Sequence, residues 1–360
     1  MARHVFVFGA GASYAAAGIP LGRDLIWQYH GDCGLVHELR SGRPDLTKDN
    51  EKSRLFREFL VLCEGRFCEL KGIVRQWDNR GIDIFYLYPL HKRYYADELL
   101  KQLLKEAKSE DIRLVMQLIS EHILGASCNG LNNGLYESFV SQILPRHPEA
   151  YIISLNFDFL LHEERAKVYF NLHEESRARV CFNYCLPFHW IDPHREYIPQ
   201  RGIPLAKLHG SLDWAKCREC GSLGLLFPYL PELHYRTATC PSCHGRLEPF
   251  IVVPYMGEPK ELEAVWASAK KALTEADRVT VMGYSFPSYD TAIRDLFRTA
   301  VPMGTEIQVV DNVDTNADAH VRSSKEAALR KTCGQILPDR KVIIRLDGFE
   351  NYIKQPDAWL

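Results

Sequence analysis

Four cysteines in the middle of the chain have the spacing of a metal site. Cys217 and Cys220 form one Cys-x-x-Cys pair, Cys240 and Cys243 form a second, and nineteen residues separate the two pairs. Thiolates in such pairs bind Zn²⁺ tetrahedrally, and four of them leave no open position for water. The spacing therefore predicts a zinc ion with a structural role, held in a zinc-ribbon module over residues 212–250.

Polar side chains follow an apolar stretch in the segment Ser154-Leu-Asn156-Phe-Asp158. Residues 151–155 are typical of a buried strand, so Asn156 and Asp158 fall at its carboxyl end, where ligands bind in open parallel sheets. The alternative interpretation is that these residues only cap a following helix, as Asn and Asp often do. Capping explains one of the two more readily than both.

His209, in the segment Lys207-Leu-His209-Gly-Ser, is a candidate general base. An imidazole titrates near neutral pH, so it can take a proton from a hydroxyl group or from water. A histidine considered alone is more often structural than catalytic, and both interpretations remain open at this point.

A glycine-rich turn, Gly9-Ala10-Gly11-Ala-Ser13, follows the apolar residues 4–8 and leads into a helical pattern. A strand, a glycine turn and a helix start together expose backbone N–H groups that can bind a phosphate. Taken alone, the pattern fits an ordinary tight turn equally well. The segment Gly283-Tyr-Ser285, after the apolar residues 278–282, repeats the strand-to-turn pattern in the second half of the chain.

The elements that would position these residues alternate between short apolar strands and helices. The strand-like stretches are residues 4–8, 151–155, 251–253, 278–282, 307–310 and 341–345, and helical patterns cover residues 261–275 and 289–300. This alternation predicts an α/β fold with a Rossmann-like, doubly wound parallel sheet. Residues 24–150 are mostly helical in their periodicity, so we expect a helical insertion there within a single domain over residues 1–360.

Composition excludes several classes of protein. Of 360 residues, 46% are hydrophobic and 25% charged, which is ordinary for a globular protein. The 44 basic and 46 acidic residues nearly cancel, so we expect no direct nucleic-acid binding and no anionic membrane surface. No apolar stretch is long enough to span a bilayer. Eleven cysteines that include two Cys-x-x-Cys pairs suit a reducing, cytoplasmic location better than a disulfide framework.

The order and wording of these motifs resemble the sirtuin family, whose members consume NAD by cleaving the bond between nicotinamide and ribose. The resemblance extends from Val5 to about Asn312. It includes residues 18–23, Gly-Ile-Pro-Leu-Gly-Arg, which are similar to the family segment Gly-Ile-Pro-x-Phe-Arg. The position of His209 between the other sirtuin-like segments favours its catalytic interpretation.

The resemblance implies a role for each matching residue. Asn156 would orient the nicotinamide ribose and a water, and His209 would take a proton. The first glycine turn would hold the diphosphate, Asp158 the carboxamide, Asn312 the adenosine ribose, and Ser285 the adenosine side. The NAD-binding residues that the resemblance implies are Gly9, Ala10, Gly11, Ser13, Ile19, Pro20, Arg23, Asn156, Asp158, Gly283, Ser285 and Asn312.

The chain departs from the deacylase pattern in its acceptor region. Gly22 replaces the family phenylalanine that shields the reaction centre from water. Pro254 removes a backbone donor from the segment that matches the acyl-lysine-binding strand. The intervals of 144 residues between Gly11 and Asn156, and of 52 between Asn156 and His209, look longer than in histone-deacylase sirtuins. These departures resemble the bacterial sirtuin-like NAD hydrolases of antiviral defence, in which water is the acceptor.

Three functions follow as hypotheses. The first is an NAD glycohydrolase with NAD as substrate, which would act as a defence effector. The second is an NAD-dependent protein deacylase or ADP-ribosyltransferase, and the third is a nucleotide-binding module without turnover. Because unrestrained NAD loss would kill its host, the hydrolase hypothesis also implies control by formation of a homo-oligomer or by a partner protein, for example a hexameric ATPase.

Overall fold

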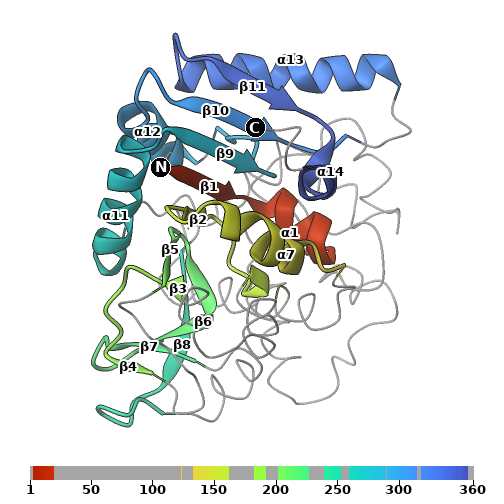
Figure 1. Ribbon diagram of the computed structural model, residues 1–360. Coiled ribbons are helices and arrows are strands. Elements are labelled where there is room, and N and C mark those ends of the chain that lie inside the picture. Colours follow the sequence, from red (N-terminus) through yellow and green to blue (C-terminus); the bar gives the residue numbers. More distant parts are fainter. Residues whose placement is uncertain are drawn as a thin grey trace, which may run out of the picture. The chain divides into compact units, whose positions relative to one another are not determined.

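The computed structural model describes residues 3–19, 123, 133–161, 182–191, 202–226, 239–252, 259–288, 290–313 and 318–355 (Figure 1). The chain divides into two compact units, Met1–Ile19 with Ala126–Leu360, and Pro20–Gly125. Within the second unit the described residue is Ile123, so the described fold is that of the first unit. The helical insertion expected over residues 24–150 lies largely outside the described residues, and it stays a prediction, as does the single domain over 1–360.

A seven-stranded parallel sheet forms the centre of the first unit. Its strands are β1 (His4–Phe8), β2 (Tyr151–Ser154), β3 (Phe182–Asn183), β5 (Ile203–Lys207), β9 (Arg278–Met282), β10 (Glu306–Val310) and β11 (Val342–Arg345). They lie in the order β11-β10-β9-β1-β2-β5-β3, and every neighbouring pair is parallel. The chain builds outward from β1 through β2, then returns to the other side of β1 with β9. The predicted doubly wound parallel sheet is confirmed.

Helices pack on both faces of this sheet, because right-handed crossovers in opposite directions place them on opposite sides (Figure 1). One group that packs together is α1 (Ala10–Ala17), α7 (Leu135–Ser138), the π-helical turn η3 (Phe139–Ile143) and α14 (Gly348–Lys354). The other group is α11 (Glu263–Thr274), α12 (Thr291–Ala300) and α13 (Ala319–Ile336). Among the described helices, none combines the length and the apolar composition that crossing a bilayer requires.

Strand β1 is fully buried because aromatic side chains cover it. The Phe8 ring meets the Phe139 ring edge-on, with centroids 4.9 Å apart, and Phe6 meets Phe139 in the same way at 5.0 Å. Phe349 of α14 also packs against Phe8. These contacts fix α14 and η3 over the central strand, and therefore over the turn that leads from β1 into α1.

A second, four-stranded sheet carries the cysteine pairs. It contains β4 (Trp190–Ile191), β7 (Leu223–Leu225), β6 (Gly210–Cys217) and β8 (Leu247–Ile251), in the order β4-β7-β6-β8. Strand β6 is antiparallel to both β7 and β8. The sequence predicted a strand at residues 251–253 among those of the parallel sheet, and this prediction was wrong. The strand ends at Ile251 and belongs to the small sheet.

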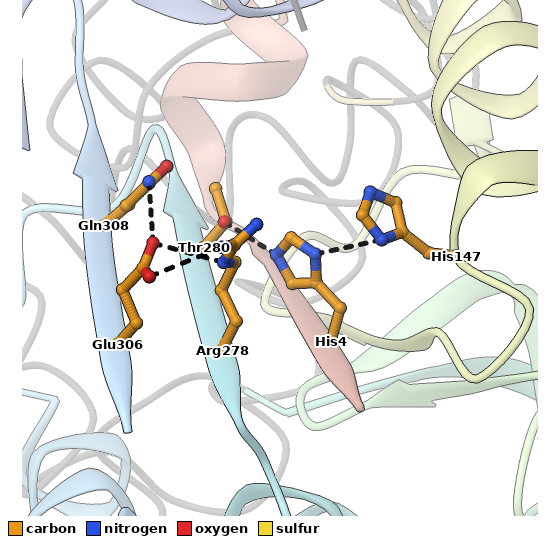
Figure 2. Close-up of polar contacts among 6 residues, drawn as sticks. All are labelled: His4, His147, Arg278, Thr280, Glu306 and Gln308. Atoms are coloured by element: carbon orange, nitrogen blue, oxygen red, sulfur yellow. Dashed lines mark hydrogen bonds and ion pairs between the residues drawn. The ribbon is translucent and has the colours of Figure 1, made fainter. Parts of the chain in front are cut away.

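The amino-terminal edge of the parallel sheet carries a buried histidine (Figure 2). The Nε2 of His4 lies 2.8 Å from the Thr280 hydroxyl, and its Nδ1 lies 3.4 Å from the Nδ1 of His147. Burial, His147 and then Arg278 together lower the pKa of His4 to about 2. Burial, followed by Arg278 and Arg146, also lowers the pKa of His147. Both rings are therefore neutral in the folded protein at neutral pH.

An acidic residue balances the charge of Arg278 at this edge. The Arg278 Nε lies 3.1 Å from the Glu306 Oε1, and Gln308 donates to the same carboxylate over 3.1 Å (Figure 2). These three side chains come from the neighbouring strands β9 and β10. The network lies at the edge opposite to the turns after β1 and β9, so it bears on stability rather than on a ligand there.

The neutral histidine makes stability depend on pH. Below pH 6.5 the unfolded chain protonates His4 but the folded chain does not, so the free energy of unfolding falls as the pH drops from 7 toward 5. His4→Gln should reduce that dependence by up to about 1.4 kcal/mol per pH unit, measured by urea unfolding. The matched control is His320→Gln, because His320 is exposed on α13. If the unfolding free energy of His4→Gln depended on pH as strongly as that of the wild type, the assignment of His4 as neutral in the folded protein would be contradicted.

Candidate functional site

The turns that follow β1 and β9 lie against each other at the carboxyl edge of the sheet, where the strand order reverses. The Gly9 N–H donates to the Met282 carbonyl over 2.9 Å, and the Gly11 N–H donates to the Gly283 carbonyl over 2.8 Å. In open α/β sheets, ligands bind at this point of reversal. The two turns that the sequence analysis singled out therefore form one structure.

No side chain fits between these two turns. A Cβ atom on Gly9 would lie 2.5 Å from the Tyr284 Cβ, and one on Gly11 would lie 2.9 Å from the Gly283 Cα. Gly283 has a φ of 66°, and a Cβ there would lie 2.1 Å from the backbone nitrogen of Ala12. Contact of backbone with backbone thus requires glycine at these positions, whatever ligand the turns bind.

Asn156 is bound to the turn after β1. Its Nδ2 donates to the Gly9 carbonyl over 3.0 Å and to the Ser13 Oγ over 2.8 Å. Asn156 is 6% exposed, and its Oδ1 has no hydrogen-bond partner within the described part of the chain. A buried acceptor without a partner costs roughly 1–3 kcal/mol. This oxygen therefore marks a position where a ligand or a water can bind.

Tyr136 extends this network, although the sequence pattern did not predict a role for it. Its hydroxyl lies 3.0 Å from the Ser13 Oγ, and both groups are buried. Burial and then the charge of Asp158 hold the pKa of Tyr136 well above its usual range, so the phenol stays protonated. Tyr136 therefore helps to hold Ser13, which in turn holds the Asn156 amide. Tyr136 lies in α7, far from the glycine turn in sequence, and no sequence pattern linked the two.

Asp158 makes the contacts of a helix cap. Its Oδ1 accepts from the Leu160 N–H over 3.2 Å, where residues 160 and 161 are helical, and its carbonyl accepts from the buried Lys207 ammonium group. Capping therefore accounts for Asp158, whereas the Asn156 amide points to the turn after β1 instead. The binding role of Asp158 stays a prediction.

His209 lies in the turn between β5 and β6 and is 4% exposed. Gly210 follows with a φ of 73°, and a Cβ there would lie 2.2 Å from the Phe250 carbonyl, so the turn requires glycine. The His209 carbonyl accepts from the Val252 N–H over 2.8 Å. The Nε2 of its ring lies 3.5 Å from the Asp290 Oδ2. The backbone of His209 is thus held by the residue that follows β8, and its ring faces a carboxylate.

Other predicted binding residues flank the two turns. Ala10 is the first residue of α1, Ile19 is buried just after that helix, and Ser285 is exposed in the turn after β9. Pro20 and Arg23 lie outside the described residues. The contacts above bring Gly9, Ser13 and Asn156 together directly, whereas the roles of these flanking residues stay predictions.

Asn312 is held by a different set of contacts. It follows β10, is exposed, and forms an isolated β-bridge with Asp347. Its carbonyl accepts from the Lys325 ammonium group. Asn312 therefore lies at the same carboxyl edge of the sheet, one strand beyond β9, and its assignment to an adenosine ribose stays a prediction.

The four cysteines form a cluster that fits a tetrahedral metal. Their Sγ atoms all lie within 4.8 Å of one another, with Cys217 3.4 Å from Cys243 and Cys220 3.6 Å from Cys240. Zinc–sulfur bonds of about 2.3 Å place tetrahedral sulfurs about 3.8 Å apart. Each pair begins a tight backbone turn, because the Gly221 and His244 N–H groups donate to the Cys217 and Cys240 carbonyls. The cluster can hold zinc with no position left for a substrate.

Zinc removal should unfold the small sheet. We expect one Zn²⁺ per chain by elemental analysis, and Cys220→Ser should lose it, because three thiolates bind zinc far more weakly than four. Hydrogen exchange should then show loss of protection in β6 and β8. Cys333→Ser is the control, since Cys333 is buried in α13, remote in sequence from the cluster. Metal-free purified protein with full protection would refute the zinc assignment.

The contact between the two turns should be essential for stability. Gly283→Ala combines a left-handed backbone with a steric clash, so it should cost roughly 3 kcal/mol or more in denaturant unfolding. Gly18→Ala is the matched control. Gly18 has a φ of 69°, but a Cβ there would meet no atom within 4 Å, so only the backbone cost of about 1–2 kcal/mol applies. Equal costs for the two variants would show that the turns can separate freely.

Comparison with known proteins gives a partial match. No protein-family model matches the chain. It is 29% identical over 134 residues, 37% of its length, to NAD-dependent protein deacylase 2 of Pyrobaculum aerophilum. That match spans about half (49%) of the curated relative.

Solved structures of Sir2 are similar over most of the chain at low identity. One is Sir2 with the inhibitor EX-527, 2'-O-acetyl-ADP-ribose and a deacetylated p53 peptide, with 13% identity, a TM-score of 0.40, and coverage of 99% of this chain and 94% of that one. Another is Sir2 with a p53 peptide and NAD⁺, with 13% identity, a TM-score of 0.40, and coverage of 99% and 93%. Similarity of this size assigns no function.

Proposed function

We propose that the chain binds NAD and cleaves its nicotinamide–ribose bond, with water as the acceptor, to give nicotinamide and ADP-ribose. The observation that carries the proposal is the state of Asn156. Its amide is fixed to the turn after β1, and its buried Oδ1 is left without a partner beside the reversal point of a doubly wound sheet. Such an oxygen suits the binding of a ribose hydroxyl or an attacking water.

The turn after β1 supports the binding of a dinucleotide diphosphate. It opens helix α1, whose dipole favours an anion at its amino terminus. The Gly11 and Ala12 N–H groups already donate to the Gly283 and Gly9 carbonyls, so the helix dipole rather than these two donors supports the anion. The curated relative is named as an NAD-dependent enzyme, which agrees with this choice of dinucleotide.

The proposed reaction needs a group that positions the ribose and a group that takes a proton. Asn156 would hold the ribose and the water, since its amide nitrogen is already engaged and only its oxygen remains. His209 would accept a proton from a ribose hydroxyl or from the water. The zinc cluster would support the small sheet, of which β6 is a strand, and would take no part in the chemistry.

A protein deacylase is the second candidate, because the curated relative is named as one. The two candidates share NAD binding and differ only in the acceptor. Gly22 and Pro254 are the sequence features that favour water over acyl-lysine, and both lie outside the described residues. The homo-oligomer, the ATPase partner and the role in antiviral defence stay predictions from the resemblance.

Two substitutions test the mechanism. Asn156→Ala and His209→Ala should each lower the rate of nicotinamide release from NAD roughly a hundredfold or more, the range for general acid–base groups, with NAD binding retained. His320→Ala on exposed α13 is the control and should leave the rate unchanged. The assay is run with and without an acetylated peptide. Nicotinamide release only in the presence of the peptide would replace the hydrolase assignment with the deacylase one.

A further inference from the structure

Asp290 is a buried carboxylate that does not cap the helix that it precedes. It is the N-cap residue of α12, where an aspartate usually accepts a hydrogen bond from the first turn of the helix. Here its side chain makes no such bond, and Asp290 is only 1% exposed. The carboxylate is therefore directed into the protein, away from the helix that it could stabilise.

Tyr284 and His209 meet this carboxylate at the same oxygen. The Tyr284 hydroxyl donates to the Asp290 Oδ2 over 2.6 Å. The His209 Nε2 lies 3.5 Å from that oxygen, at an ion-pair distance, and is itself buried without a hydrogen-bond partner among the described residues. The Asp290 Oδ1 is buried without a hydrogen-bond partner among the described residues. A buried carboxylate with so few partners is costly to keep. Its cost is explained if the carboxylate acts on the histidine.

The turn after β9 is strained in a way that brings these groups together. Phe286 has a φ of 52°, in the left-handed region that non-glycine residues rarely adopt. Its ring is buried against Phe297 of α12, and its carbonyl accepts from Arg294 over 3.0 Å. The strained residue thus ties the start of α12 to the turn that carries Tyr284.

We propose that Asp290 is a positioning residue for His209. The proposal rests on the proposed function of His209 as a proton acceptor. In the proposed arrangement the Nε2–H of the ring is directed at the carboxylate across the 3.5 Å contact, which leaves the lone pair on Nδ1. When Nδ1 takes the proton of a ribose hydroxyl or of water, the electron pair of that O–H bond stays on the oxygen, and Asp290 balances the charge of the imidazolium. The same arrangement of an acid behind a histidine operates in hydrolase triads.

Asp290→Asn tests the proposal with little change in shape. The asparagine amide would donate to Nε2, place the ring proton on Nδ1, and remove the acceptor from the reaction. Nicotinamide release should fall roughly a hundredfold with the KM for NAD unchanged. Asp295→Asn is the matched control, because Asp295 lies on the exposed side of α12 in an ion pair with Arg298. It should retain the wild-type rate.

A double mutant separates positioning from structure. If Asp290 acts through His209, then Asp290→Asn should have no further effect on the rate of His209→Ala. If Asp290 only supports the fold, then Asp290→Asn should lower the rate by the same factor in both backgrounds, which would overturn the proposal.

A readout that needs no activity distinguishes this proposal from the proposed function. Spectra of protein labelled with ¹⁵N-histidine should show the His209 ring protonated on Nε2, with its signals identified by their absence from His209→Ala. Asp290→Asn should shift the proton to Nδ1, and Tyr284→Phe, which keeps the carboxylate, should retain it on Nε2. Unchanged His209 signals in folded Asp290→Asn would overturn the positioning role. Absence of nicotinamide release from the wild type would instead overturn the proposed function.

If Asp290→Asn does not fold, the wild-type spectrum still tests the proposal. A His209 ring protonated on Nδ1 in the wild type would overturn the positioning role.

Discussion

The site depends on the close contact between two backbone turns. Gly9 and Gly11 after β1 meet Gly283 after β9 at distances that exclude any Cβ atom. This contact sets where α1 begins, and the Asn156 amide is attached to α1 and to its preceding turn. Tyr284, whose hydroxyl donates to the carboxylate near His209, lies so close to Gly9 that a Cβ there would clash with it. Asn156 and the proposed His209–Asp290 pair thus both depend for their positions on the contact between the two turns.

The sequence predicted the parts of the molecule that follow from local patterns. Continuous apolar stretches give the buried parallel strands β1, β2, β9 and β10 and the half-buried strand β11, and the cysteine spacing gives the metal cluster. It did not predict α13, because that 18-residue helix buries only Leu329, Cys333 and Ile336 and therefore shows little apolar periodicity. It assigned β8 to the wrong sheet, because strand pairing is decided by neighbours far away in the chain.

The residues of the site that the sequence missed share a physical reason. Tyr136 contacts Ser13, and Asp290 lies near His209, so in each case the partner in the site is more than eighty residues away in the chain. Asp290 also occupies an N-cap position, where its residue type already has an ordinary explanation. Asn156 was identified because its strand end is a position where ligands gather, whereas the partner of its amide became evident only in three dimensions.

Strand β6 joins two functions on a single extended segment. It begins one residue after His209 and ends at Cys217, the first of the clustered thiols. The proposed proton acceptor lies just before one end of the strand and the thiol cluster at the other, and its pairing with β8 shifts between Ser211 and Ala215. Loss of the bound metal would release the Cys217 end of the strand. The proposed chemistry would then depend on a metal site that takes no part in the reaction.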